Sequence, residues 1–371
     1  MRRAEHSPTI LDVAREAGVS YTTVSLVLNK TPGRKISEAT RRQVLKAVEK
    51  LNYQPNIVAR SMRTKRTHTI GVLISDIFTP LFSQSIAGIE EVASHHEYDI
   101  IVCNVGAQVD FERERIRFLL QKQVDGVILV SHSRPVDNSH LKELQLKGMP
   151  LVLVNRDLQD PDISNILIDN VQGAASAVEH LVKLGHRRIA GIMAPLTGPS
   201  FCRASMRSFE GYKYGLESAG IPYDGRLVVE EPDLPASEVA GYKMAKKLFG
   251  SLQPSDRPTA IYCANDFLAF GAIRALYEEG MRVPNDVAIV GHDNTRAGLS
   301  FIPTLTSVAQ PLLEAGRIAA TILFDKISGE NLEPVQMKLP CKLFIRESCG
   351  ARKGSDAKLE IWERDSGFLL T

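Results

Sequence analysis

The chain has 371 residues with a net charge of +2, and 44% of them are apolar, so its length favours two or three domains with more than one buried core. No run approaches the ~18 consecutive apolar residues of a membrane span, and the N-terminus lacks an apolar run followed by a small-residue cleavage site, so we expect a cytoplasmic protein without membrane contact. The five cysteines form no CxxC pair, which argues against structural zinc and favours free thiols.

Positive charge is concentrated at the N-terminal end of the chain. Residues 1–67 contain 14 Lys and Arg against 5 Asp and Glu, a net charge of +9, so residues 68–371 carry −7. This division is expected of a phosphate-binding head on an acidic body, because counterion release supplies much of the affinity of a DNA-binding surface.

Residues 9–29 predict two short helices joined by a sharp turn at Gly18. Ser20 can accept a hydrogen bond from the first turn of the second helix, whose outward end then holds residues 21–23. In a helix-turn-helix, that end enters the major groove. An ordinary helical hairpin has the same pattern, but the excess of positive charge favours DNA binding. The apolar residues expected between the helices are Val13, Ala14, Ala17, Val24, Val27 and Leu28.

A third helix is expected over about residues 37–51, with Ser37 as its N-cap, and it completes a helical head of about residues 1–54. Pro55 can start a further helix, but only about two turns remain before the next region begins. Since an isolated helix that short is marginal in water, residues 55–68 are predicted to be a hinge and linker that is disordered unless something holds it. The hinge is therefore a candidate switch.

From residue 69 onward, short β-branched runs alternate with helical segments, which predicts βαβ units in two doubly wound parallel sheets. Ligands of such sheets bind beyond the carboxyl ends of the strands, and two sheets can share a cleft there. Residues 351–371 contain no sustained heptads and are expected to be a tail or a docked segment. The expected strands cover about residues 70–74, 100–103, 126–130, 151–154, 189–193, 260–263 and 287–290.

Enzyme motifs are absent from the sequence. No two glycines are separated by a single residue, as the dinucleotide fingerprint requires, and there is no P-loop or GxSxG motif. His96 and Glu97 begin like a zinc-protease helix, but Ile100 stands where its second histidine belongs. We therefore expect no catalytic residues, no metal and no cofactor. A nucleotide-using enzyme stays an alternative that measured turnover would revive.

The motifs of the chain resemble those of one known family. Residues 10–25, 51–56 and 58–62 are similar to the DNA-binding head and hinge of the lactose-repressor (LacI/GalR) family of bacterial regulators, and the match continues to about residue 349. The resemblance implies a homodimer whose two heads read a roughly palindromic double-stranded DNA operator. Most members of the family are repressors, and a small-molecule effector controls them.

The resemblance also implies a body similar to periplasmic sugar-binding proteins. We expect an N-subdomain at about residues 69–168 and 301–329 and a C-subdomain at about residues 169–300 and 330–350. A solute-binding protein with the same body is the alternative function. It predicts an export signal and no basic head, and neither expectation fits this sequence.

Carried over by position, Tyr21, Thr22 and Leu26 match the residues of the recognition helix that reach base edges. Leu26 departs from the usual Arg or His. A leucine cannot donate to guanine but can pack on a thymine methyl, so the operator preference should differ at that base. Alternatively, Leu26 packs in the core of the head. The positions that match contacts to the DNA backbone are Thr9, Thr23, Ser25, Asn29 and Tyr53.

The resemblance assigns Asn56, Ala59 and Met62 of the hinge to DNA binding as well. Met62 stands where the family has a leucine that wedges into the minor groove, and methionine is apolar and flexible enough to serve. Ala59 is small and would let two symmetry-related hinge helices approach closely. Alternatively, Met62 is a linker residue without a contact.

Polar residues at strand ends suit a hydroxyl-rich ligand, so the expected effector is a sugar or a sugar derivative. Two positions depart from the family: the usual arginine falls on Ser208, with Arg203 and Arg207 as possible substitutes, and His292 stands where Phe or Tyr is usual. For each residue, an ordinary satisfied polar group at a strand end is the alternative. The remaining positions that match effector contacts are Asp76, Phe78, Asn155, Arg156, Asn265, Asp266 and Asp293.

Overall fold

The computed structural model describes residues 8–28, 36–54, 66–77, 79–106, 109–131, 138–156, 158, 160–198, 201 and 203–351. The chain divides into two compact units, Met1–Thr67 and His68–Thr371, and each has a hydrophobic core of its own. Among the described helices, none combines the length and the apolar character needed to span a bilayer.

The described part of the head contains the helices α1 (Ile10–Glu16), α2 (Tyr21–Leu28) and α3 (Glu38–Lys50). Thr9 caps α1, since its side chain accepts from the Asp12 N–H while the Asp12 carboxylate accepts from the Thr9 N–H at 2.9 Å. Gly18 has φ +62°, a left-handed conformation that favours glycine, and it turns the chain between α1 and α2. The Ser20 hydroxyl accepts from the Thr23 N–H at 3.2 Å and starts α2. The predicted helix-turn-helix and third helix are therefore confirmed.

Two six-stranded sheets form the body, in the orders β11-β5-β4-β3-β1-β2 and β12-β10-β9-β8-β6-β7. All strand pairs are parallel except that β12 runs antiparallel to β10. The strands of the first sheet are β1 (Thr69–Ile74), β2 (Asp99–Asn104), β3 (Gly126–Val130), β4 (Leu151–Val154), β5 (Ser164–Asp169) and β11 (Gln336–Pro340). Those of the second sheet are β6 (Ile189–Ile192), β7 (Val228–Val229), β8 (Ala260–Cys263), β9 (Ala288–His292), β10 (Thr306–Ala309) and β12 (Lys342–Phe344).

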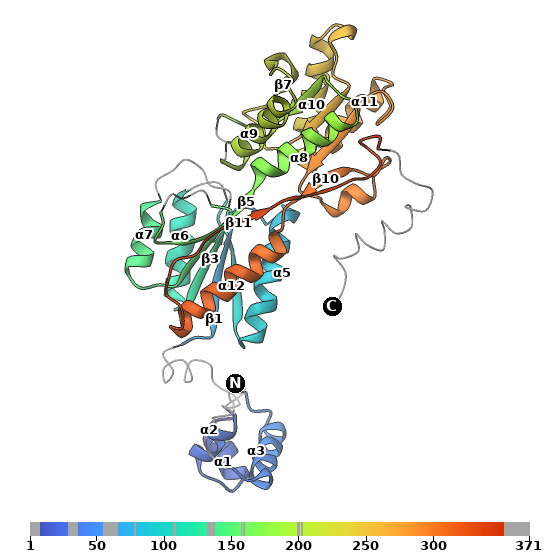
Figure 1. Cartoon of the computed structure of the whole chain (residues 1–371). Helices are drawn as coiled ribbons and strands as arrows, with labels where there is room; N and C mark the ends of the chain where they lie inside the picture. Colours follow the sequence, from blue (N-terminus) through green and yellow to red (C-terminus); the bar gives the residue numbers. More distant parts are fainter. Residues whose placement is uncertain are drawn as a thin grey trace, which may run out of the picture. The chain divides into compact units, whose positions relative to one another are not determined.

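Helices cover both faces of each sheet, as expected of doubly wound α/β domains. In the first sheet, α5 (Pro80–His95) and α12 (Leu312–Ser328) lie side by side on one face (Figure 1), while α6 (Val109–Gln121) and α7 (Ser139–Leu146) cover the other. The helices of the second sheet are α8 (Asn170–Lys183), α9 (Arg203–Ser218), α10 (Glu238–Ser251) and α11 (Asp266–Glu278). Short 3-10 helices occur at η1 (Gly225–Leu227), η2 (Pro254–Asp256) and η3 (Arg296–Leu299).

Close backbone contact holds α5 against α12. A Cβ on Gly316 would lie 2.3 Å from the carbonyl oxygen of Ser85, and one on Gly88 would lie 2.2 Å from that of Leu313. The Arg317 guanidinium also donates to the Glu91 carboxylate at 2.7 Å. The two helices therefore form one tightly packed layer.

The chain crosses between the sheets after β5, after β10 and after β11. Our expected subdomain limits near residues 301 and 330 are wrong, because β10 pairs with β9 in the second sheet and β11 pairs with β5 in the first. Residues 301–309 thus belong with the C-subdomain and 330–340 with the N-subdomain. The pattern of β11 was not visible because it is a largely exposed edge strand that contains Gln, Lys and Pro.

Candidate functional site

The outward face of α2 is the candidate DNA surface. Val24 and Val27 are buried in the core of the head, whereas Tyr21 is 60% exposed and Thr22 is also exposed. Tyr21, Thr22 and Ser25 therefore share the face opposite the core, as helical spacing requires. Leu26 is half-buried and is not among the described residues that pack in that core, which argues against a purely structural role.

Other predicted DNA contacts have visible structural roles in the head. The Thr9 hydroxyl is 2.7 Å from the Asp12 carboxylate, within the cap of α1. The hydroxyl of Thr23 is 2.9 Å from that of Ser20, and Tyr53 packs partly buried against the core. These contacts hold the side chains in place within the head, and their contacts with DNA stay predictions. The predicted residues Asn29, Asn56, Ala59 and Met62 lie outside the described residues.

In the first subdomain, Asp76 and Asn155 follow β1 and β4, so both lie at carboxyl ends of strands. The Thr79 hydroxyl donates to Asp76 at 2.9 Å. Asn155 is buried and has φ +57°, a conformation in which asparagine is one of the few tolerated residues. The predicted residue Phe78 lies outside the described residues.

Arg156 forms a buried ion cluster rather than an open contact point. Its guanidinium donates to the Glu112 carboxylate at 3.0 and 3.3 Å, to the Ser131 hydroxyl at 2.8 Å and to the side-chain oxygen of Asn138. His140 lies 2.6 Å from the same carboxylate. Burial opposes the charge of Glu112, but the hydrogen bond from His140 and the charge of Arg156 outweigh it and lower the pKa of Glu112. The terminal nitrogens of Arg156 are therefore already used within the subdomain.

In the second subdomain, Asn265 and Asp266 make hydrogen bonds that stabilise the fold. Asn265 caps α11 by accepting from the Leu268 N–H at 2.8 Å, and its amide donates to the Ala236 carbonyl oxygen at 3.1 Å. Asp266 is fully buried and accepts from the hydroxyls of Ser307 at 2.6 Å and Thr295 at 2.9 Å. Burial raises its pKa to about 6. The predicted effector contacts of these two residues would compete with the bonds seen here.

Arg346 is a structural residue to which our sequence interpretation assigned no role. It is 2% exposed and donates to the carbonyl oxygen of Leu305 at 2.7 Å and to the side chain of Asn294 at 2.6 Å. The signal in the sequence for the importance of Arg346 was its place in the Arg-Glu-Ser segment at 346–348, which matches the family. Arg346 therefore fastens the end of the body to the loop after β9.

Uncharged polar groups gather at the carboxyl ends of β8, β9 and β10. The hydroxyl of Tyr262 is 3.0 Å from Nδ1 of His292 and also bonds to Ser208. The amide of Gln310 donates to Asp293 at 2.7 Å. Burial, together with the nearby Asp266 carboxyl, raises the pKa of Asp293 well above its usual range. At this edge the chain therefore has two neutral side chains, Ser208 and His292, where the family usually has an arginine and an aromatic residue.

Arg203 and Arg207 lie in the first two turns of α9, on either side of the buried Ser205. Arg203 is exposed and Arg207 is half-buried. Ser208 itself is buried and bonds to Tyr262, and an effector contact by Arg203 or Arg207 stays a prediction.

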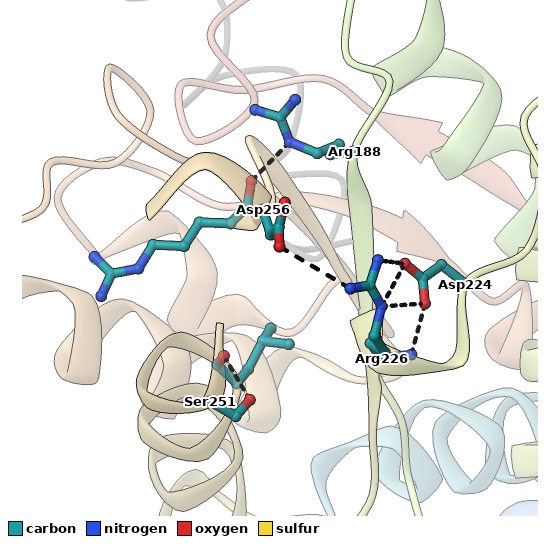
Figure 2. Close-up of polar contacts among 7 residues, drawn as sticks. Arg188, Asp224, Arg226, Ser251 and Asp256 are labelled. Carbon is teal, nitrogen blue, oxygen red and sulfur yellow. Dashed lines mark hydrogen bonds and ion pairs between the residues drawn. The ribbon is translucent and has the colours of Figure 1, made fainter. Parts of the chain in front are cut away.

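A second polar cluster lies at the opposite edge of the same sheet. Figure 2 shows Arg226 between Asp224, at 2.8 Å, and Asp256, at 4.0 Å, with Arg188 bonded nearby to the backbone of Arg257. These residues precede β6, β7 and β8, so they lie at the amino ends of the strands. We interpret this cluster as a surface connection between loops, because ligands of such sheets bind at the other edge.

Comparisons with known proteins agree with this division into a head and a body. Residues 9–56 match a family described as bacterial regulatory proteins, lacI family, and residues 178–349 match a periplasmic binding protein-like domain. Catabolite control protein A of Priestia megaterium is 36% identical, and the match covers 92% of this chain and 98% of that protein. The HTH-type transcriptional repressor PurR of Mannheimia succiniciproducens is 33% identical over the same shares. These relatives are transcriptional regulators, not enzymes.

Solved structures give the same result. The lac repressor dimer bound to operator and the anti-inducer ONPF has a TM-score of 0.78 at 30% identity, and the match covers 92% of this chain and 99% of that one. A complex of the transcriptional regulator CelR with cellobiose has a TM-score of 0.66 at 33% identity, over the same shares of each chain.

Proposed function

Since this chain belongs to the lacI family and is a DNA-binding transcriptional repressor with an effector-binding domain, we propose that it binds a roughly palindromic operator as a homodimer and that a sugar or sugar derivative controls it. The observation that carries the proposal is the exposed amino-terminal end of α2, within an N-terminal region, residues 1–67, that has a net charge of +9. Phosphates would bind to the positive residues, while Tyr21, Thr22 and Leu26 would face base edges.

Dimeric binding is supported by the size of the reading surface. A single α2 presents only a few side chains to bases, and helix-turn-helix proteins gain specificity by placing two such helices in successive turns of the major groove. The related lac repressor was solved as a dimer on its operator. We expect this chain to bind an inverted repeat much more tightly than a single half-site.

Control by a small molecule is supported by the body. Its two sheets place hydrogen-bonding residues at carboxyl strand ends, and three crossovers connect the subdomains in the part of the chain that the structure describes. Related regulators were solved with cellobiose and with ribose. A ligand that favours one angle between the subdomains would change the spacing of the paired hinges, and so whether residues 55–68 order on DNA.

Selection of bound sequences from a random duplex pool tests the proposal. The full chain should enrich an inverted repeat, and adding the controlling sugar should change that binding. A chain that enriches no sequence, even at low salt, would contradict DNA recognition. The alternative, a solute-binding protein, has no support from the head, because its residues 9–56 match the regulatory family.

A further inference from the structure

The strand ends of the second subdomain contain two buried polar atoms that nothing in the described part of the chain satisfies. One is Nε2 of His292, whose side chain is 1% exposed, and the other is Oε1 of Gln310, which is 7% exposed. Buried polar groups in native proteins are nearly always hydrogen-bonded, so each such atom needs an explanation. Their position gives one.

Both atoms belong to one edge of the second sheet. His292 ends β9, and β9 pairs with β10 so that His292 lies beside Val308. Gln310 follows two residues later, immediately after β10. Val308 lies on the same face of the sheet as His292, and Gln310 bonds to Asp293, the residue that follows His292. This is the carboxyl edge, where ligands of α/β sheets bind.

The remaining bonds of both side chains are fixed internally. Nδ1 of His292 is 3.0 Å from the Tyr262 hydroxyl, and Tyr212 stacks on Tyr262 with the ring centroids 6.3 Å apart. The amide nitrogen of Gln310 donates to Asp293. Each side chain is therefore held by one end while its other polar end has no partner in the described residues.

We propose that His292 and Gln310 determine effector specificity by hydrogen-bonding two hydroxyl groups of an uncharged polyhydroxylated molecule, an inference that rests on the proposed function. A hydroxyl donates and accepts, so it can satisfy Gln310 Oε1 and either tautomer of His292. Burial holds the pKa of His292 at about 4, so near neutral pH the ring offers no positive charge to an acid. The nearby Asp266 carboxyl, with a pKa of about 6, is mostly charged near neutral pH and disfavours an anion further.

The test uses the full chain and measures binding by calorimetry and melting temperature. Ribose, glucose and cellobiose are the neutral probes, while gluconate and glucose 6-phosphate are charged probes that Arg203 and Arg207 could attract. We expect at least one neutral sugar to bind and both charged probes to bind more weakly. Binding of the charged probes alone, or no binding of any neutral sugar, overturns the proposal.

Variants separate ligand binding from structural support. His292→Phe and Gln310→Met should each weaken binding of the responding sugar by about tenfold or more. The control is His186→Phe. His186 is half-buried and bonds to Thr259 at the amino ends of β6 and β8, away from the proposed site, so this variant should leave sugar binding intact. If His292→Phe lowers the melting temperature but not the sugar affinity, the residue is only structural and the proposal fails.

The readouts also distinguish this inference from the function it depends on. If the proposed function fails, the unmodified chain selects no DNA sequence. If only the inference fails, the unmodified chain still binds its operator, but the two variants respond to sugar as the unmodified chain does.

Discussion

The pKa of His292 links a single residue to the stability of the body. Burial lowers this pKa from 6.5 to about 4, so the folded protein resists a proton that the unfolded chain accepts. The stability that the neutral ring provides is complete above about pH 6.5 and is lost as the pH falls toward 4. Between about pH 7 and about pH 5, we expect His292 to account for a loss of about 2 kcal/mol in the free energy of unfolding.

Urea unfolding of the wild type and of His292→Phe at both pH values measures this contribution. Asp266 acts in the opposite direction, because its raised pKa of about 6 makes folding more favourable as the pH falls below it. Both proteins keep Asp266, so the difference between them isolates the histidine. An equal pH dependence in the two proteins would show that His292 is accessible to protons in the fold.

Leu26 is the residue at which we expect base preference to differ from that of most relatives. Replacing Leu26 with Arg supplies the donors that guanine O6 and N7 accept, so the selected operator should change from thymine toward guanine at one position in each half-site. A good bidentate contact corresponds to about 1–3 kcal/mol of discrimination. Sequencing of selected duplexes measures the change.

Leu45→Arg is the matched control for that substitution. Leu45 is 49% exposed on α3, so the same charge is added to the head but away from α2. It should raise affinity for all duplexes without changing the preferred sequence. If Leu26→Arg also leaves the preference unchanged, Leu26 does not face a base.

Among the elements, the contact between α5 and α12 depends on glycine. A methyl group at Gly88 would lie 2.2 Å from the Leu313 carbonyl oxygen, and backbone cannot move aside as a flexible side chain can. We expect Gly88→Ala to lower the free energy of unfolding by about 1–3 kcal/mol in urea. Gly250→Ala is the control, because nothing lies within 4 Å of that position in α10, and it should be neutral or stabilise by up to about 1 kcal/mol.

Several strands that are buried on both faces were predictable, since a parallel strand between two helical layers is often apolar throughout. The buried strands β5 and β10 were missed, because they contain Ser, Asn, Asp or Thr. The runs at β1 and β3 are buried from Ile70 to Ile74 and from Gly126 to Val130, and both predictions are confirmed. The exposed edge strand β11 lacks that pattern, so it was missed and the subdomain limits with it. The head was predictable because Gly18, Ser20 and Ser37 mark its turn and caps locally.

The candidate site was less predictable, because its character depends on pairs that are distant in sequence. Arg156 was expected to face an effector, but its partner Glu112 comes from α6, 44 residues earlier. Asp266 likewise bonds to Ser307, 41 residues later. The sequence shows which polar residues end the strands, whereas only the fold shows whether another side chain already satisfies them.

At the scale of the whole molecule, the uneven distribution of charge predicts that DNA binding and sugar binding reside in different parts of the chain. Removing residues 1–67 takes away the net charge of +9 together with α2, and leaves a body of net charge −7 with its own cores. We expect the remaining body to lose all measurable affinity for DNA at any salt concentration, because it would repel phosphates. Sugar binding should stay within about threefold of the full chain, since every described candidate effector residue lies in the body. Gel-shift and calorimetric titrations of both proteins measure the two affinities, and DNA binding by the isolated body would locate the interface outside the head.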